Sequence, residues 1–283
     1  MNGGTPQGKR KFSSTRLVQE ISSGEYFILK STPLIDRKAV ETLRNEGKYQ
    51  FESPNLQSSL KYWIENNQYY LLKEYIKGVG LITFYKALKR KEKRKFIPRF
   101  LTGVSKLLDE LHVQKIVHLD LKPTNIIIEG SVNDFSVKLI DFGMAWDLKT
   151  DVFDKRKSSY PFGHAAPELI LNEPALFVPQ TDYYALGILL YEMMEGEIPF
   201  LHSNPIQSLN LQLNMALPAL SRKWKAYQTI LNKLTAKQAF HRPPNQLPRL
   251  EQKRVLEQGI ELRYENLKMM RRDLENIYPV PEF

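Results

Sequence analysis

Two short stretches of this chain decide its fold. They are His118-Leu119-Asp120-Leu121-Lys122-Pro123-Thr124-Asn125 and, a little further on, Asp141-Phe142-Gly143. Between them lie two apolar runs, residues 126–128 and 137–140, and a polar turn at Asn133-Asp134. This pattern predicts two short strands joined by a tight turn, which would place the two stretches at neighbouring ends of one hairpin.

The polar residues of both stretches match the needs of phosphoryl transfer. That chemistry requires a carboxylate to orient the attacking hydroxyl, a cation for the transferred phosphate and two oxygen ligands for magnesium. Asp120, Lys122, Asn125 and Asp141 supply this set. The stretches resemble the catalytic loop H-R-D-x-K-x-x-N and the metal-binding loop D-F-G of the eukaryotic-type protein kinase family.

The resemblance implies ATP and Mg²⁺ as cofactors and assigns a role to each residue. Asp120 would accept or orient the proton of the substrate hydroxyl, and Lys122 would neutralise charge on the moving phosphoryl group. Asn125 and Asp141 would bind magnesium through oxygen. His118 is expected to support the loop rather than to act as a base.

The fold expected from the resemblance is α+β and two-lobed. A small β-rich N-lobe would span residues 1–76, a large, mainly helical C-lobe residues 77–248, and a helical tail residues 249–283. Apolar runs around the turn signals at residues 22–24 and 65–68 predict two hairpins in the N-lobe. A helix is expected over residues 36–49, with Asp36 as its cap.

The nucleotide-binding residues of the N-lobe are assigned through the same resemblance. Lys30 ends an apolar strand and takes the place of the family's V-A-I-K lysine, which holds the α- and β-phosphates. Glu46 is its expected ion-pair partner, with Glu41 as the alternative. Residues 74–76 form the expected hinge, so Glu74 and Ile76 are assigned to nucleotide binding.

The loop that covers the nucleotide departs from the family pattern. Counted back from Lys30, Gly8 is the one glycine of the motif that is kept, and Arg10, Ser13 and Thr15 replace the other consensus residues. Glycine serves there because backbone amides must approach phosphate closely. The segment before Gly8 is a poor strand, so the first N-lobe strand is expected to be missing or degenerate.

Lys73 lies beside the expected hinge, where the family usually has an uncharged residue. A buried lysine needs an anionic partner, because an unpaired buried charge is expensive. Glu46 and Asp141 are the candidates. A register shift of one residue would put Leu72 at this position instead.

Leu119 replaces the arginine that normally meets a phosphorylated residue of the activation segment. We therefore expect activity that does not depend on phosphorylation of that segment. Its candidate sites are Thr150, Ser158, Ser159 and Tyr160. Lys122-Pro123 is typical of serine/threonine kinases, whereas Pro161 resembles tyrosine kinases, and we favour serine/threonine.

Further similarities extend over the large lobe. Residues 166–168 resemble the A-P-E that closes the activation segment. Asp182 matches the acidic residue that braces the catalytic loop, and Arg242 is expected to pair with Glu168. In the tail, Arg263 interrupts an apolar stripe at helical spacing. That stripe could form a dimerising helix or pack on the large lobe, and we favour packing.

Composition limits the other function classes. A chain of 283 residues with 42% hydrophobic and 25% charged residues is ordinary for a globular protein. It has no cysteine, which excludes disulfides and thiolate metal sites. The apolar runs are too short to span a bilayer and no signal peptide is evident, so we expect a cytoplasmic protein without a membrane partner.

The net charge of +10 favours acidic partners. Part of it lies in the run Lys89–Lys95, which could be a docking patch for an acidic partner but is more typical of a solvated helix end or loop. Without interleaved aromatic residues the run does not favour nucleic acid. The sequence leaves the oligomeric state open, and a protein is the expected substrate.

Three functions fit these observations. The first is an active protein kinase. The second is a pseudokinase that binds nucleotide or acts as a scaffold, which the altered loop at Gly8 and the charge of Lys73 favour. The third is a small-molecule phosphotransferase of the aminoglycoside-kinase type, against which Glu168, Asp182 and Arg242 argue. We favour the first, because the residues that handle charge are all present.

Overall fold

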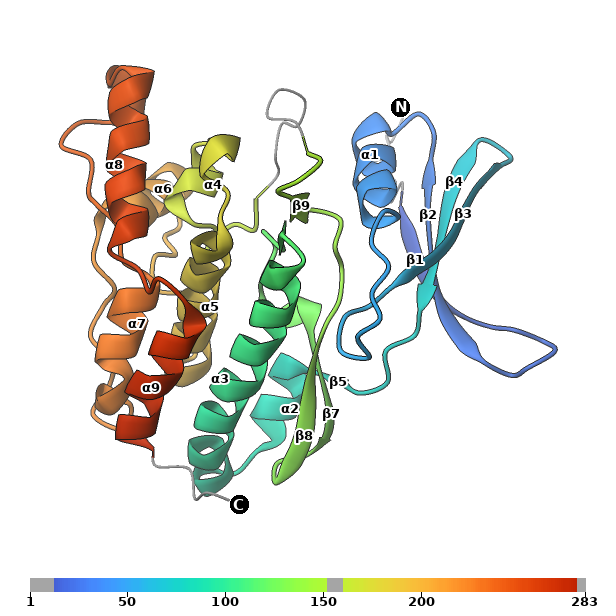
Figure 1. The fold of residues 1–283 in the computed structure, drawn as a ribbon, viewed down its shortest axis with the longest axis horizontal. Coiled ribbons are helices and arrows are strands. Elements are labelled where there is room, and N and C mark those ends of the chain that lie inside the picture. The colour runs from blue at the N-terminus through green and yellow to red at the C-terminus, as the bar shows by residue number, and fades with distance from the viewer. Residues whose placement is uncertain (1–12, 152–159, 279–283) are drawn as a thin grey trace, which may run out of the picture. The chain divides into compact units, whose positions relative to one another are not determined.

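The computed structural model of the chain describes residues 13–151 and 160–278. The chain divides into two compact units, Met1–Ile76 and Lys77–Phe283. The first is built around an antiparallel sheet and the second is mostly helical (Figure 1). The α+β architecture predicted from the sequence is confirmed.

In the smaller unit, residues 13–76 form a four-stranded antiparallel sheet with one helix. The strand order is β1-β2-β4-β3. Its elements are β1 (Ser14–Gln19), β2 (Tyr26–Pro33), α1 (Arg37–Glu46), β3 (Ser59–Glu65) and β4 (Gln68–Glu74). The expected loop residues Gly8 and Arg10, and any strand before them, lie outside the described residues.

Both predicted hairpins of this unit are present. In the second, β3 and β4 are joined by Asn66 and Asn67, whose φ angles are +47° and +59°. Asparagine tolerates this left-handed conformation, which a two-residue type I′ turn requires at both positions. In the first hairpin Thr15 is paired with Lys30.

Helix α1 begins where the sequence predicts and ends earlier. The side chain of Asp36 caps it by accepting a hydrogen bond from the amide of Ala39 at 3.0 Å. The expected helix runs to Tyr49, but α1 ends at Glu46, because Gly47 follows it and glycine is a poor helix former. Its buried face packs against Tyr69 and Leu71 of β4.

The described residues of the larger unit form helices, a three-stranded sheet in the order β5-β7-β8 and a two-stranded sheet of β6 and β9. The helices are α2 (Leu81–Ala87), α3 (Arg90–Val113), α4 (Pro167–Ile170), α5 (Pro179–Glu195), α6 (Pro205–Asn214), α7 (Gln228–Leu234), α8 (Arg249–Glu261) and α9 (Leu267–Ile277). The strands are β5 (Val79–Gly80), β6 (Ile116–Val117), β7 (Ile126–Ser131), β8 (Asp134–Leu139) and β9 (Trp146–Asp147). Its described part also contains four 3₁₀ helices: η1 (Pro123–Asn125), η2 (Pro174–Leu176), η3 (Lys225–Tyr227) and η4 (Pro244–Gln246).

The core of the larger unit surrounds α3 and α5. The apolar residues of α3 from Phe100 to Leu111 recur at the spacing that predicts one buried helix face, and they are buried. Helix α5 is buried on nearly all sides, with Leu186, Ile188, Leu189 and Leu190 at 0% exposure. Gly187 lets α7 approach, since a Cβ there would lie 2.5 Å from the side chain of Thr235. These two buried helices support the polar loops of this unit.

The predicted hairpin between the two signature stretches is also present. Strands β7 and β8 pair antiparallel with Ile126 opposite Leu139. Just past them, the amide of Ile140 donates to the carbonyl of Asn125 at 3.0 Å. The hairpin therefore holds residue 125 of one stretch next to residue 140, which precedes the other.

The tail helices pack on the larger unit. Leu267, Met270 and Leu274 of α9 are buried, and Arg271 binds Asp109 of α3 with 2.7 Å between Nη1 and Oδ2. The apolar stripe is thus core, as the favoured interpretation has it. Among the described helices none combines the length and apolarity that a membrane span would need.

Candidate active site

Asp182 of α5 anchors the loop of residues 118–125. This carboxylate is fully buried and accepts hydrogen bonds from the amides of His118 and Leu119 at 2.8 and 2.9 Å. The ring of His112 in α3 supplies a third contact at 2.8 Å. The bracing role expected of Asp182 is therefore visible in its contacts, and it fixes the backbone rather than a side chain.

His118 is a structural residue of this loop. It is fully buried, and its Nδ1 accepts the amide proton of Asp120 at 3.2 Å. The ring proton therefore sits on Nε2, which donates to the carbonyl of Ile140 at 3.3 Å. The ring of Phe142 meets it edge-on, with 5.0 Å between centroids. With both nitrogens engaged, the imidazole ties the two signature stretches together and is not available as a base.

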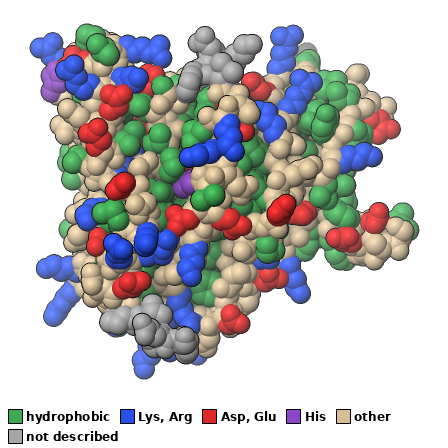
Figure 2. Space-filling view, viewed as in Figure 1, with side chains coloured by type: hydrophobic (Ala, Val, Ile, Leu, Met, Phe, Trp, Pro, Cys, Tyr) green, Lys and Arg blue, Asp and Glu red, His purple; other side chains and the backbone are tan. Residues whose placement is uncertain are grey.

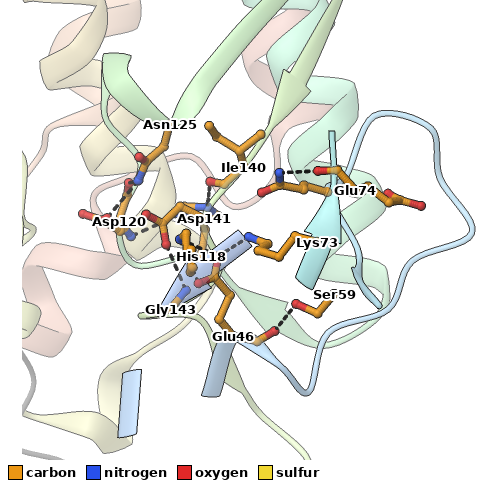
Figure 3. Close-up of polar contacts among 12 residues, drawn as sticks. Glu46, Ser59, Lys73, Glu74, His118, Asp120, Asn125, Ile140, Asp141 and Gly143 are labelled. Carbon is orange, nitrogen blue, oxygen red and sulfur yellow. Dashed lines mark hydrogen bonds and ion pairs between the residues drawn. The ribbon is translucent and has the colours of Figure 1, made fainter. Parts of the chain in front are cut away.

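The carboxylate of Asp120 is held by two neighbours (Figure 3). Lys122 Nζ donates to both of its oxygens, at 2.9 and 2.8 Å. Asn125 Nδ2 donates to Oδ2 and to the backbone carbonyl of Asp120, both at 2.8 Å. Asp120 is 6% exposed and Asn125 is 4% exposed. Carboxylate, cation and amide thus form one preassembled group.

The oxygens of this region suit a magnesium ion. Because Asn125 uses its Nδ2 on Asp120, its side-chain oxygen is left as the group for a ligand. Asp141 has a left-handed backbone, with φ of +67°, and its Oδ1 lies 3.4 Å from the amide of Gly143. Among the described residues no three His, Cys, Asp or Glu side chains gather as a metal site. Magnesium bound through phosphates needs one or two carboxylate or amide oxygens, which Asn125 and Asp141 supply.

In the smaller unit, two lysines bind the carboxylate of Glu46, and Figure 3 labels one of them, Lys73. Lys30 Nζ lies 2.9 and 2.8 Å from the two oxygens of Glu46, and Lys73 Nζ also binds Oε1. Glu46 and Lys73 are 1% and 0% exposed. The ion pair predicted between Lys30 and Glu46 is present, and Glu41 is exposed.

Lys73 takes the buried position beside the hinge, as the alignment without a register shift predicts. Alternate residues of β4, namely Tyr69, Leu71 and Lys73, are buried, while Leu72 is only partly so. Glu46, one of the two expected partners, forms an ion pair with Lys73. Glu46 thus compensates a charge that would otherwise be costly to bury.

The expected hinge has a partner that the sequence did not indicate. The carbonyl of Glu74 accepts a hydrogen bond from the side-chain amide of Gln57 at 2.8 Å, and its carboxylate accepts from the amide of Ser58 at 3.0 Å. Ile76 is half-buried at the end of this unit. A carbonyl has two lone pairs, so Glu74 can still accept one further donor.

Comparison with known proteins assigns the family. Residues 6–254 match the model of the protein kinase domain family. The chain belongs to this family.

Similar kinases come from distant organisms. The chain is 29% identical over 218 residues to the serine/threonine-protein kinase PrkC of Bacillus subtilis, covering 73% of this chain and 32% of the relative. It is 30% identical over 202 residues to the serine/threonine-protein kinase pak-2 of Caenorhabditis elegans, covering 69% and 37%. It is 33% identical over 201 residues to an Aurora kinase of Eremothecium gossypii, covering 68% and 52%. The match thus spans between a third and about half of these relatives.

The position of the family's loop arginine has become apolar in this kinase domain. Leu119 is 4% exposed and belongs to a buried cluster with Val117, Trp146, Ala165, Leu169 and Phe177. Tyr160, one of the candidate phosphorylation sites, packs against this cluster. The Leu119 side chain therefore ties the catalytic loop to both ends of the activation segment by packing instead of by charge.

The predicted pair between Arg242 and Glu168 is wrong. Arg242 is exposed, and Glu168 is held by Arg263, with Nη1 2.6 Å from Oε1 and Nη2 3.0 Å from Oε2. Arg263 also donates to the carbonyls of Ala236 and Gln180. Arg263 lies two residues after Glu261, the last residue of α8, so the end of this helix brings its side chain to the buried Glu168. The interruption of the tail's apolar stripe by a charge was the signal that could have found it.

Proposed function

We propose that this chain is an ATP- and magnesium-dependent protein kinase that phosphorylates serine or threonine. The observation that carries the proposal is the assembly around Asp120, in which Lys122 and Asn125 both bind a carboxylate that Asp182 holds in place through the loop backbone. Catalysis of phosphoryl transfer depends mostly on such positioning and electrostatics.

In the proposed reaction Asp120 orients the hydroxyl of the protein substrate and takes its proton. The hydroxyl oxygen forms a bond to the γ-phosphorus of ATP, the bond from that phosphorus to the bridging oxygen breaks, and ADP leaves. Lys122, now bound to Asp120, would turn to the transferred phosphoryl group as negative charge develops. The products are ADP and a phosphorylated side chain.

The remaining residues would bind the nucleotide. Magnesium, when bound, neutralises phosphate charge, and Asn125 and Asp141 would hold it through oxygen. Lys30 would contact the α- and β-phosphates, with Glu46 keeping its ammonium in place. Gly8 is assigned to the loop over the phosphates, and the backbone at Glu74 and Ile76 to the base.

The preference for serine or threonine has two supports. Lys122 follows Asp120 by two residues and binds its carboxylate, as expected of the lysine in the serine/threonine loop. PrkC and pak-2 are serine/threonine-protein kinases by name. Analysis of the phosphorylated amino acids in a generic protein substrate tests this, and phosphotyrosine alone would contradict it.

We also infer that activity is independent of phosphorylation in the activation segment. A phosphate needs a cation to bind, and the position that supplies one in the family is the buried Leu119. Joint substitution of Thr150, Ser158, Ser159 and Tyr160 by Ala or Phe should leave activity within about twofold. Ser158 and Ser159 lie outside the described residues. A large loss would contradict the inference.

The decisive assay is phosphate transfer from labelled ATP with magnesium to a generic protein. Asp120→Asn should lower the rate by about 10²–10⁴-fold, because a positioned base contributes that much. Lys95→Ala, on the exposed start of α3, is the control and should leave the rate unchanged. Equal rates in the wild type and Asp120→Asn would contradict the proposal.

Two observations favour a second candidate, a scaffold without catalysis. Gln57 already bonds the carbonyl of Glu74, and Lys73 places a second cation on Glu46. Both could weaken nucleotide binding. A thermal shift with ATP and magnesium separates the two candidates. Stabilisation together with transfer supports the kinase, and the absence of both supports the scaffold.

A further inference from the structure

The basic run Lys89–Lys95 forms the start of α3 and is divided between two faces of it. Arg90, Lys93 and Arg94 have the spacing of one helix face, because residues three and four apart are neighbours. Lys91 and Lys95 are exposed on the remaining surface. Cations at a helix start oppose the macrodipole, so this arrangement weakens the helix rather than stabilising it. The run therefore needs a reason other than helix stability.

The Arg90 face borders a groove that a distant segment completes. Two adjoining cavities, of about 670 and about 370 Å³, share Arg90, Arg94, Lys223 and Trp224 in their walls. The larger one extends along Arg222, Tyr227, Ile277 and Tyr278. The start of α3 and the end of α9 lie at the same end of this unit in Figure 1, where Lys and Arg side chains are prominent in Figure 2. We call this the basic groove.

The cations of the basic groove lack anionic partners. In the part of the chain that the structure describes, Arg90, Arg94 and Arg222 form no ion pair, and all three are exposed. Among the described residues that line the two cavities, Glu195 is the one carboxylate, and it accepts hydrogen bonds from the amide and hydroxyl of Ser221 at 3.0 and 2.8 Å. The positive end of the α3 dipole adds to the field. The groove is therefore an attractive site for several negative charges at once.

The floor of the groove is apolar and fixed. Trp224 and Tyr227 are 5% and 7% exposed, and the indole of Trp224 donates to the carbonyl of Met194 at 2.8 Å. Burial raises the pKa of Tyr227 to about 12, so its hydroxyl stays neutral. At this exposure, and with Lys223 over the ring of Trp224, the two rings do not present open faces on which nucleic acid bases could stack.

We propose that the basic groove binds an extended acidic segment of a partner protein. Two cavities in a row suit a peptide that places carboxylates or phosphates against the arginines and one apolar side chain against Trp224. A concave surface with a buried aromatic floor does not suit a lipid bilayer, which needs exposed apolar side chains to insert. Binding requires neither ATP nor Asp120, so it stands independently of catalysis.

The test is the affinity of a fluorescein-labelled peptide of glutamates around one central phenylalanine, measured by anisotropy without nucleotide. Arg94→Glu with Arg222→Glu should raise Kd at least about tenfold, equal to about 1.4 kcal/mol. Each substitution removes an attraction and adds a repulsion. The matched control is Lys91→Glu with Lys95→Glu. It changes the net charge by the same amount as the test variant, its two residues lie in the run Lys89–Lys95, and it should alter Kd by less than about twofold. Added salt should weaken wild-type binding, since exposed charges are screened.

Further arms separate the other acidic ligands. The same peptide with glutamine for glutamate should not bind, and Asp120→Asn should bind the acidic peptide like the wild type. Equal loss in the test and control variants would reduce the effect to net charge and overturn the proposal. It would also be overturned if poly-U RNA or phosphatidylserine vesicles required Arg94 and Arg222 while the peptide bound neither variant nor wild type.

Discussion

The two units of this kinase domain hold their buried carboxylates in opposite ways. In the smaller unit, Glu46 is compensated by side chains alone, the ammonium groups of Lys30 and Lys73. In the larger unit, Asp182 accepts hydrogen bonds from two backbone amides. The planar guanidinium of Arg263 donates to both carboxylate oxygens of Glu168. Lysine is a mobile point charge, whereas an amide or a bidentate arginine fixes direction as well as charge.

The difference shows which parts of the site are rigid. The catalytic loop is bonded through its backbone to α5, so its geometry is part of the fold. The Glu46 site depends on flexible lysine side chains, one of which would be needed by the nucleotide. In the proposed mechanism, Lys73 would keep Glu46 compensated when Lys30 contacts phosphate. We make four predictions about unfolding free energy from this difference, from the largest expected effect to the smallest.

Removal of the arginine clamp should cost the most. Arg263→Ala leaves Glu168 fully buried without its ionic partner and also removes the bonds to Ala236 and Gln180. We expect a loss of unfolding free energy near the upper end of about 3–5 kcal/mol. Urea unfolding followed by tryptophan fluorescence measures it.

Arg242→Ala is the matched control, since it removes an arginine that is exposed. Its effect should stay within about 0.5 kcal/mol. A larger loss in Arg242→Ala than in Arg263→Ala would reverse the assignment of the Glu168 partner.

Loss of the carboxylate in the smaller unit should cost somewhat less. Glu46→Ala strands Lys73 at 0% exposure, and we expect about 3–5 kcal/mol, toward the lower end because a lysine can lose its proton. The unfolding transition is read from Trp63 in the same unit, with the other two tryptophans replaced by phenylalanine.

The reciprocal change, Lys73→Met, should be neutral or stabilising, because Glu46 keeps Lys30. The double variant Glu46→Ala with Lys73→Met should recover much of the loss. If Lys73→Met cost as much as Glu46→Ala, the two lysines would not share the carboxylate as described.

Substitution of the backbone anchor should have an intermediate effect on stability and a large one on geometry. Asp182→Asn directs an amide group where two backbone N–H groups now donate, so we expect about 1–3 kcal/mol. The measurement is thermal unfolding, with backbone hydrogen exchange at residues 118–120 as the local readout. Unchanged exchange there would contradict the anchoring role of Asp182.

The smallest effect concerns a lysine of the larger unit that has no carboxylate among the described residues. Lys237 donates to the carbonyl of Gln212 at 2.7 Å and lies over the ring of Phe200 at 3.9 Å. Burial, and then the charge of Arg263, lowers the pKa of Lys237 from 10.5 to about 7. Between pH 7 and 9 the unfolded chain therefore binds more protons than the folded one.

Stability should consequently rise with pH over that window, by less than about 1.4 kcal/mol per unit. In Lys237→Met this rise should disappear when urea unfolding is compared at pH 7, 8 and 9. An equally steep rise in Lys237→Met would show that another group is responsible.

Much of the fold followed from local patterns in the sequence. The hairpins around residues 22–24 and 66–67, the cap at Asp36 and the buried face of α3 depend on turn chemistry and periodicity, which neighbouring residues specify. The ion pair of Lys30 and Glu46 and the contacts of Asp182 were also predicted, because family motifs fix their spacing. The predicted pairing of Arg242 with Glu168 was wrong because it was based on the position of Arg242 along the chain. Helix α8 brings another arginine, Arg263, to Glu168 instead.

By itself the sequence determined the family, the residues that handle charge and the loss of the loop arginine at Leu119. Only the tertiary structure decided several of the partners they meet: Arg263 for Glu168, Gln57 for Glu74, Glu46 for Lys73 as well as Lys30, and Arg222 beside Arg94 in the basic groove. The physical reason is that motifs are short and local, whereas a buried charge is compensated by whichever group the packed helices and strands bring within hydrogen-bond distance.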